Sequence, residues 1–228
     1  MDTGATEPDH PTAGLDYSRL YEFRFKDVDQ GSRQVVWNEI ARYLWNRMGR
    51  PQRVLDPAGG RGEFVNAVPA EECWLVDVVD YPERKTDPRV RIVIGDLFEI
   101  ELPDSYFDAV FASNLLEHFH SPEEVAAFLD RMRKTLAPGG VLALMGPNFK
   151  YCAREYFDCA DHLLPLTHVS VQELLFAAGY TVTSVVPRFL PFSFRSRLPA
   201  SPLLTRLYLR MPMLWPLQGK QFLILATP

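Results

Sequence analysis

One carboxylate and three glycines are grouped at the end of a short apolar stretch, where they are suited to binding a ligand. Residues 54–55 predict a buried strand, Asp56 ends it, and Gly59, Gly60 and Gly62 precede a short helix. Glycine tolerates positive φ angles in a tight turn and lets the backbone come close to a ligand. The stretch therefore indicates either a nucleotide-binding loop or an ordinary strand-to-helix turn that binds nothing.

The spacing within this loop distinguishes between kinds of nucleotide. The dinucleotide fingerprint G-x-G-x-x-G would place its third glycine where Val65 stands. Instead, Asp56 is followed at alternate positions by Ala58, Gly60 and Gly62. This arrangement resembles the acidic-x-Gly-x-Gly-x-Gly motif of class I S-adenosylmethionine-dependent methyltransferases, with Ala58 in place of the first glycine. The resemblance implies that the loop passes under the adenosyl group and that Asp56 lies near the amino end of the methionine.

Two further acidic residues stand at the ends of predicted strands. Asp77 comes about twenty residues after the glycine loop, a spacing at which a carboxylate accepts hydrogen bonds from both ribose hydroxyls. An exposed strand-end acid or a helix cap is the alternative. Asp96 and Leu97 resemble the adenine site of the same family, although an isolated Gly-Asp pair is also a turn signal. We expect Asp77, Val78, Asp96 and Leu97 to contact the cofactor.

A glutamate and a histidine follow the fourth predicted strand. The phrase Phe107-Asp-x-Val-x-x-x-x-x-x-Glu117-His118 is highly characteristic of the same family. Open parallel sheets bind ligands beyond the carboxyl ends of their strands, so Asn114 and Leu115 are predicted to contact the cofactor. An imidazole is the side chain best suited to exchanging a proton near neutral pH. His118 is predicted either to take a proton from an attacking hydroxyl or to hold the loop as a structural residue.

Residues 148–168 carry many ionisable side chains and are predicted to face the methyl acceptor. Asp161 and His162 form a second candidate for the base, because the aspartate is able to orient the histidine. A polar loop with local caps is the alternative. Asp158, Asp161, His162 and His168 include the ligand types of a metal site, but their spacing does not require one. We expect a site without metal.

The segment 15–25 is aromatic and basic, and it either covers the cofactor or pads the edge of the core. The family resemblance implies that Tyr21 and Arg24 touch the methionine end, with Arg24 pairing the carboxylate. Residues 1–14 are rich in proline, threonine, glycine and aspartate, and we expect a disordered tail there.

Composition limits the class of protein. The chain has 228 residues with 47% hydrophobic content, which predicts one α/β domain with a sizeable core. A net charge of -5 and a pI near 5.6 argue against a nucleic-acid binder. Three cysteines without a CxxC pair indicate neither a disulfide framework nor a zinc site. We expect a cytoplasmic protein, because no signal peptide or membrane-spanning run is present.

The part of the chain after residue 173 contains six basic residues and no acidic one. Apolar residues alternate there with arginines, among them Arg195 and Arg197. This pattern has three interpretations. The segment forms a helix at a membrane surface, it lines the site of a substrate with anionic and apolar parts, or it is a solvated face packed on the sheet edge. Peripheral membrane contact through this segment is therefore one hypothesis.

The order of the elements predicts an α/β fold. We expect a three-layer α/β/α Rossmann-like sandwich on a mainly parallel sheet, and the resemblance implies an antiparallel last strand. We expect residues 15–228 to form one methyltransferase domain, with a lid and helix in 15–50 and acceptor-side elements in 148–220. The predicted strands are 54–55, 74–79, 90–94, 106–113, 141–145, 181–186 and 221–226, and the predicted helices include 32–48, 122–136 and 171–178.

These residues predict S-adenosylmethionine as the cofactor and S-adenosylhomocysteine as the product. The acceptor is predicted to be a small molecule, with a sugar or natural-product hydroxyl favoured by a looser resemblance to bacterial biosynthetic methyltransferases. Two alternatives remain: a different S-adenosylmethionine chemistry such as cyclisation, and a non-catalytic partner in a biosynthetic or membrane-surface complex. No pattern predicts the oligomeric state.

Overall fold

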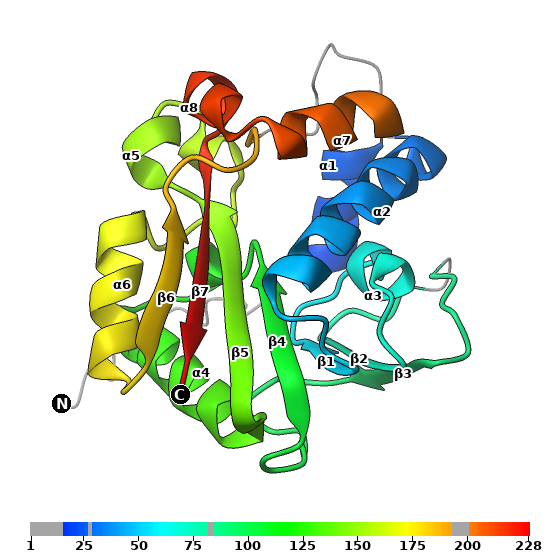
Figure 1. Ribbon diagram of the computed structural model, residues 1–228, viewed down its shortest axis with the longest axis vertical. Coiled ribbons are helices and arrows are strands. Elements are labelled where there is room, and N and C mark those ends of the chain that lie inside the picture. Colours follow the sequence, from blue (N-terminus) through cyan, green and yellow to red (C-terminus); the bar gives the residue numbers. More distant parts are fainter. Residues whose placement is uncertain (1–15, 27–28, 82–83, 193–200) are drawn as a thin grey trace, which may run out of the picture.

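A seven-stranded sheet forms the centre of the computed structural model (Figure 1). The structure describes residues 16–26, 29–81, 84–192 and 201–228. The strand order is β3-β2-β1-β4-β5-β7-β6. Strands β1 to β5 pair in parallel, whereas β7 is antiparallel to both of its neighbours. The strands are β1 (Arg53–Asp56), β2 (Glu72–Asp77), β3 (Val90–Ile94), β4 (Phe107–Ser113), β5 (Leu136–Pro147), β6 (Thr181–Val186) and β7 (Gln221–Thr227).

Helices cover both faces of the sheet, as Figure 1 shows. The longer ones are α1 (Tyr17–Phe25), α2 (Gln30–Arg47), α4 (Pro122–Thr135), α6 (His168–Ala177) and α7 (Pro202–Arg210). Short helices and 3-10 turns complete the chain: α3 (Glu63–Ala67), η1 (Leu116–His118), α5 (Phe149–Cys152), η2 (Tyr156–Asp158), η3 (Pro212–Leu214) and α8 (Trp215–Gln218).

Alternation along the strands divides the core into two apolar clusters. Val54 packs in a cluster with Trp37 of α2, whereas its neighbour Leu55 packs in the other cluster with Phe128 of α4. Successive side chains of a strand point to opposite faces of a sheet, so each buried strand supplies both clusters. This arrangement confirms the predicted three-layer α/β/α sandwich with an antiparallel last strand.

Local signals account for the bounds of α4. The Ser121 side chain accepts a hydrogen bond from the Glu124 amide, and Pro122 occupies the first turn. The helix ends one residue earlier than expected, and β5 begins at Leu136 instead of residue 141. The reason is that Leu136 pairs with Phe107 of β4, so the glycine-rich stretch is part of the strand.

The connection between β2 and β3 contains no helix in the residues that the structure describes there. Arginine side chains tie it to the rest of the protein instead. Arg89 donates hydrogen bonds to the carbonyl oxygens of Val68 and Ala70, both at 2.6 Å. Arg84 donates to the carbonyl oxygen of Gly60 at 2.8 Å, which fixes the connection against the glycine loop.

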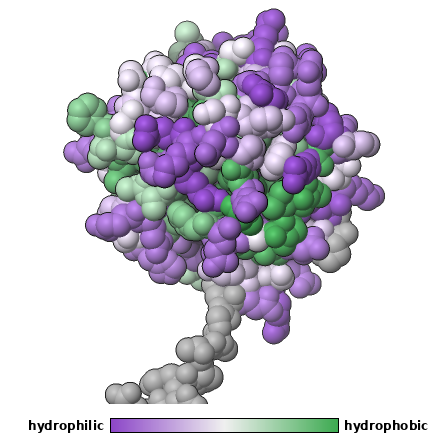
Figure 2. Space-filling model, turned by 90° about the horizontal axis from the view of Figure 1, so that it is seen from below, coloured by the Kyte–Doolittle hydropathy of each residue, from purple (hydrophilic) through white to green (hydrophobic). Residues whose placement is uncertain are grey.

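The sheet topology brings the carboxyl ends of β1, β2 and β4 together. Strand β1 pairs with β2 on one side and with β4 on the other, so the chain order reverses at β1. Ligands of open parallel sheets bind at this reversal point. Seen from below, the molecule is mostly hydrophilic, with apolar side chains right of centre and others toward the left edge (Figure 2). None of the described helices has the length and apolar character needed to cross a bilayer.

Candidate active site

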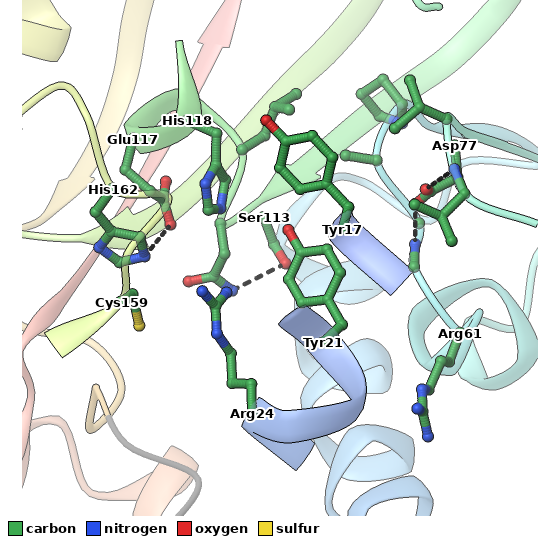
Figure 3. Close-up of a pocket in the computed structure, with 18 of the residues that line it drawn as sticks. Tyr17, Tyr21, Arg24, Arg61, Asp77, Ser113, Glu117, His118, Cys159 and His162 are labelled. Atoms are coloured by element: carbon green, nitrogen blue, oxygen red, sulfur yellow. Dashed lines mark hydrogen bonds and ion pairs between the residues drawn. The ribbon is translucent and has the colours of Figure 1, made fainter. Parts of the chain in front are cut away.

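A cavity of about 1400 Å³ lies at the carboxyl ends of β1, β2 and β4, beneath α1. A pocket for one small ligand usually has a volume of about 300–1,000 Å³. Figure 3 shows side chains from α1, the glycine loop and the segment after β4 converging on it. Of the predicted site residues, those that line the cavity are Tyr21, Arg24, Asp56, Ala58, Gly60, Asp77, Val78, Asp96, Leu97, Asn114, Leu115, His118 and His162.

Asp77 organises the floor of this cavity. Its Oδ2 accepts a hydrogen bond from the Gly60 amide at 2.7 Å, and its Oδ1 accepts one from the Val79 amide at 2.8 Å. Burial raises the pKa of the Asp77 carboxyl, and these two amide bonds oppose that rise. The aspartate therefore closes the glycine loop onto the end of β2.

Asp56 lies deeper, at the end of β1. It is 4% exposed, and its Oδ1 accepts a 3.4 Å hydrogen bond from the Ala58 amide. Burial raises its pKa to about 8, so the carboxyl is neutral near pH 7. A side chain at Gly59 would place Cβ 2.4 Å from Leu75 Cγ, so the loop packs too closely against β2 for alanine.

Gly62 is the one glycine of the predicted cofactor motif that does not line the cavity. It begins α3 with a φ of 85°, in the left-handed region that favours glycine. Its predicted cofactor contact stays a prediction, and the structure gives the residue a conformational role. The glycine turns the chain from the loop into α3.

The remaining cofactor-side residues extend the cavity along the sheet edge. Asp96 accepts a hydrogen bond from the Phe98 amide at 2.8 Å, Leu97 is buried and Val78 is exposed. Asn114 has a φ of 50°, a conformation that asparagine tolerates better than most residues. The turn at Asn114 directs the chain from β4 into η1.

Helix α1 covers the cavity and is joined to the acceptor side by one ion pair. Arg24 lies over the Tyr21 ring, 4.9 Å from its centroid, and pairs with the Asp161 carboxylate. Burial alone would raise the pKa of Asp161, but a hydrogen bond and the positive charge of Arg24 hold it below its usual value. In this structure the guanidinium meets a protein carboxylate, where the sequence predicted the carboxylate of the cofactor.

His118 and Asp161 form the first pair of the acceptor side. The His118 Nδ1 lies 2.8 Å from the carbonyl oxygen of Asp161 and 3.4 Å from its Oδ2. A carbonyl oxygen only accepts hydrogen bonds, so Nδ1 carries the proton and Nε2 has the free lone pair. The sequence predicted that Asp161 orients His162, and this is wrong: the aspartate faces His118.

His162 faces Glu117 instead. Its Nε2 lies 4.0 Å from Glu117 Oε1, and its ring packs against Tyr156 at a centroid distance of 4.9 Å. Burial lowers the pKa of His162 to about 4 and raises that of Glu117 to about 7. The imidazole is therefore neutral near pH 7.

The sequence matches a known protein family. Residues 30–185 match the family described as methyltransferase domain, which is more than half of the chain. The chain belongs to the methyltransferase family. As a class I methyltransferase it uses S-adenosylmethionine as its cofactor, as the glycine loop indicated.

Related proteins support the same assignment. A Mycolicibacterium smegmatis protein described as a probable S-adenosylmethionine-dependent methyltransferase is 29% identical over 164 residues. The match covers 68% of this chain and 60% of that protein, so the chain spans less than two thirds of that relative.

Two solved structures share the methyltransferase fold. The Burkholderia thailandensis 1,6-didemethyltoxoflavin-N1-methyltransferase has a TM-score of 0.56 at 21% identity, over 96% of this chain and 91% of that one. The O-methyltransferase NcsB1 from neocarzinostatin biosynthesis has a TM-score of 0.58 at 14% identity, over 92% and 56%.

The methyltransferase does not bring together all four residues considered for a metal. His168 lies apart from the cavity lining: its Nδ1 is 2.9 Å from the Asn148 amide nitrogen, and its ring stacks on Tyr151. Glu117, His118 and His162 are instead the group whose ligand atoms lie within 4.8 Å of one another, among the described residues.

Glu117 had no predicted role, although it stands next to His118 in the motif Phe107 to His118. It is 2% exposed and lines the cavity. The signal that points to it is an acidic residue shortly after the carboxyl end of a parallel strand, where open sheets bind their ligands. Tyr81 and Cys159 also line the methyltransferase cavity and were not predicted.

Proposed function

We propose that this methyltransferase transfers the methyl group of S-adenosylmethionine to a hydroxyl of a small molecule, such as a sugar or a natural-product intermediate. One observation carries the proposal: a single cavity joins the motif-derived residues to a group of ionisable side chains that includes His118. The cavity volume of about 1400 Å³ exceeds that of a usual single-ligand pocket, which supports binding of two molecules side by side.

The cofactor residues fit the nucleoside. Each Asp77 oxygen accepts one backbone hydrogen bond and keeps a lone pair for a ribose hydroxyl. We assign Asp96 to the adenine amine, beside the buried Leu97. Tyr21 and Arg24 are assigned to the methionine end, where the cofactor carboxylate would compete with Asp161 for the guanidinium.

His118 is the side chain best placed to take the proton of the acceptor. Asp161 holds its Nδ1, so the free Nε2 is the basic atom. Bound S-adenosylmethionine supplies an activated methyl group. The protein's own task is to hold the acceptor oxygen in line with that group, to exclude water and to accept the hydroxyl proton.

The structural relatives agree with a small acceptor. The toxoflavin enzyme was crystallised with its small-molecule substrate and S-adenosylhomocysteine, and NcsB1 with S-adenosylmethionine and 2-hydroxy-5-methyl naphthoic acid. By name, one of them methylates nitrogen and the other oxygen. They therefore support an acceptor that is a small molecule, without favouring either atom. The choice of oxygen rests on the ionisable side chains of this chain.

Calorimetric titration with S-adenosylmethionine and S-adenosylhomocysteine tests the cofactor side. Asp77→Ala should weaken both by more than tenfold, because it removes the ribose acceptor and releases the Gly60 amide. Asp80→Ala is the matched control, since Asp80 is an exposed acid in the same connection and should leave the affinity unchanged. Equal affinities of wild type and Asp77→Ala would refute this placement.

Transfer of tritium from methyl-labelled donor to sugars and phenols tests the acceptor side. A labelled hydroxyl compound, with turnover lowered more than tenfold in His118→Ala at unchanged donor affinity, is the expected result. Label found exclusively on nitrogen or carbon acceptors would contradict the proposed hydroxyl.

We also propose that the C-terminal helices contact a membrane surface. Leu203 and Leu207 of α7 are exposed, as are Met213 and Leu217 in the segment that follows. Gln218 of α8 lines the cavity, so this apolar face adjoins the site. Arg195 and Arg197, which suggested membrane contact, lie outside the described residues. Cosedimentation with anionic vesicles measures this contact.

A further inference from the structure

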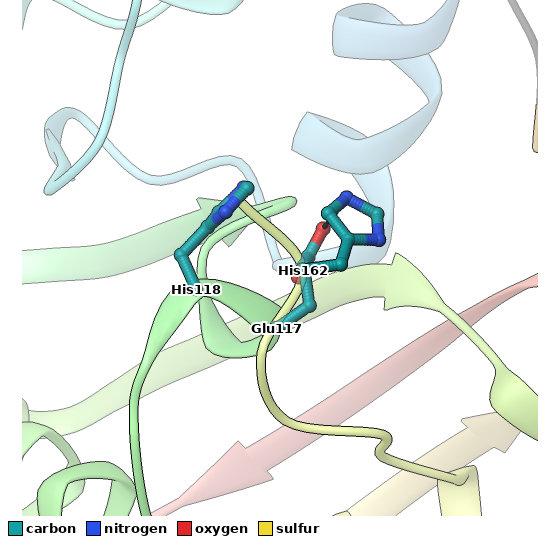
Figure 4. A group of neighbouring side chains, drawn as sticks. All are labelled: Glu117, His118 and His162. Carbon is teal, nitrogen blue, oxygen red and sulfur yellow. Dashed lines mark ion pairs between the residues drawn. The ribbon is translucent and has the colours of Figure 1, made fainter. Parts of the chain in front are cut away.

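Three side chains with metal-binding atoms meet on the acceptor side of the cavity (Figure 4). They are Glu117 and His118 of η1 and His162, from the loop after η2. One ligand atom from each lies within 4.8 Å of the others. Two histidines and one carboxylate form a ligand set found in catalytic zinc sites, where a further position stays open for water or substrate.

Two of these side chains have buried polar atoms without a hydrogen-bond partner in the described part of the chain. They are Oε1 of Glu117 and Nδ1 of His162. The side chains are 3% and 5% exposed, respectively. A buried polar atom without a partner costs about 1–3 kcal/mol, and more when it is charged. The Glu117 oxygen faces His162 Nε2 at 4.0 Å without forming a hydrogen bond. A buried carboxylate oxygen seldom stays without a partner in native structures, so this gap favours a bound ligand between the two side chains.

The third side chain is already oriented as a ligand. The proton on His118 Nδ1 points to the carbonyl oxygen of Asp161 at 2.8 Å, which leaves the lone pair on Nε2. Histidines that bind metal usually donate their other N–H to a carbonyl or carboxylate, because this fixes the ring and strengthens the ligand. The contact between His118 and Asp161 is of this kind.

We propose that Glu117, His118 and His162 bind one divalent transition-metal ion, with Zn²⁺ the best match to the ligand types. The inference rests on the proposed function, because the open coordination position would face the cavity and bind the acceptor hydroxyl. It replaces the expectation of a metal-free site. His162 is distant in the sequence from the adjacent Glu117 and His118, so spacing gave no signal.

The ion would change how the acceptor loses its proton. A coordinated hydroxyl is more acidic because the ion stabilises the alkoxide, and the proton passes to water. The alkoxide oxygen then forms a bond to the methyl carbon while the sulfur–carbon bond breaks. That electron pair stays on sulfur, so the sulfonium and the alkoxide become a neutral thioether and an ether. His118 would then serve as a ligand instead of the base.

Metal binding is measured on the full chain, first stripped with a chelator and then titrated with Co²⁺ and Zn²⁺. The expected result is one ion per chain by elemental analysis. The visible absorption of bound Co²⁺ should have the intensity typical of a low coordination number. Glu117→Gln and His162→Ala should each weaken binding by more than tenfold. His120→Ala, which removes an exposed histidine from the same segment, should leave it unchanged.

Circular dichroism melts and titration with S-adenosylmethionine accompany each variant. A variant that keeps its cofactor affinity but loses the ion supports the metal site, whatever the acceptor proves to be. Absence of stoichiometric binding by wild type, or equal binding by wild type and Glu117→Gln, overturns the proposal. Methyl transfer by chelator-treated protein without stoichiometric ion would leave the proposed function in place and remove the metal.

Discussion

Replacement of Asp56 by asparagine is expected to change how stability depends on pH. Burial raises the pKa of this carboxyl from 3.8 to about 8, and the negative charges of Asp77 and Glu63 add to the rise. At pH 7 the carboxyl is therefore neutral in the folded protein and ionised in the unfolded chain. The resulting stabilisation is fully present below pH 3.8 and is lost as the pH rises through 8.

The size of the effect follows from this shift. One pKa unit corresponds to about 1.4 kcal/mol, so a shift of about 4 units amounts to roughly 6 kcal/mol over the whole range. Between pH 5 and pH 7, wild type should lose about 3 kcal/mol relative to the variant. The asparagine side chain of the variant has no proton to lose, so it would not contribute to this slope.

Urea unfolding at several pH values between 5 and 8 measures the difference between wild type and Asp56→Asn. Asp108→Asn is the control. Burial alone would raise the pKa of Asp108, but hydrogen bonds from the Arg53 side chain and two backbone amides hold it below its usual value. Its contribution is lost only as the pH falls below 3.8, so that difference should be flat. A flat difference for Asp56→Asn would mean that the buried carboxyl is ionised, and the reasoning would fail.

Two further predictions concern the loop and the C-terminal helices. Gly59→Ala should destabilise the protein by about 1–3 kcal/mol in urea unfolding, because its Cβ would collide with Leu75. Alanine at Gly31, where the nearest atom would be 3.5 Å away, should cost nothing measurable, and equal stabilities of the two variants would contradict the close packing. The double variant Leu203→Asp/Leu207→Asp should lose most of its binding to anionic vesicles, whereas Phe176→Asp, an exposed apolar position on α6, should retain it. Unchanged cosedimentation of the double variant would rule out this face.

Local sequence patterns predicted most of the fold. Strands β3 and β6 have the predicted bounds, because short runs of β-branched residues between turn signals indicate a strand. Strand β5 was predicted too short. Its proline and glycines from 138 to 140 signal a turn, but pairing between Leu136 and Phe107 keeps this stretch in the sheet. Tertiary pairing outweighed local preference there.

The two halves of the site differ in how well the sequence predicted them. The glycine loop, Asp77 and Asp96 lie on consecutive strand ends, so spacing along the chain predicts that they line one cavity. The acceptor side depends on contacts between distant segments. A local pattern contains no information that Asp161 faces His118 or that Arg24 reaches Asp161 from α1. Only the folded chain brings these partners together.

The two outer strands of the sheet bear on how the protein behaves at high concentration. Strands β3 and β6 each leave one side unpaired, and an unpaired strand edge is a template for pairing with another chain. On β3, Ile92 and Ile94 are partly exposed, but Arg91 next to them adds a charge and lies over Trp74. Strand β6 has a register irregularity, and the Arg47 side chain bonds Ser184. The charge on β3 and the register irregularity of β6 therefore oppose edge-to-edge aggregation. Loss of the Arg91 charge would make β3 the edge more prone to pair with another chain.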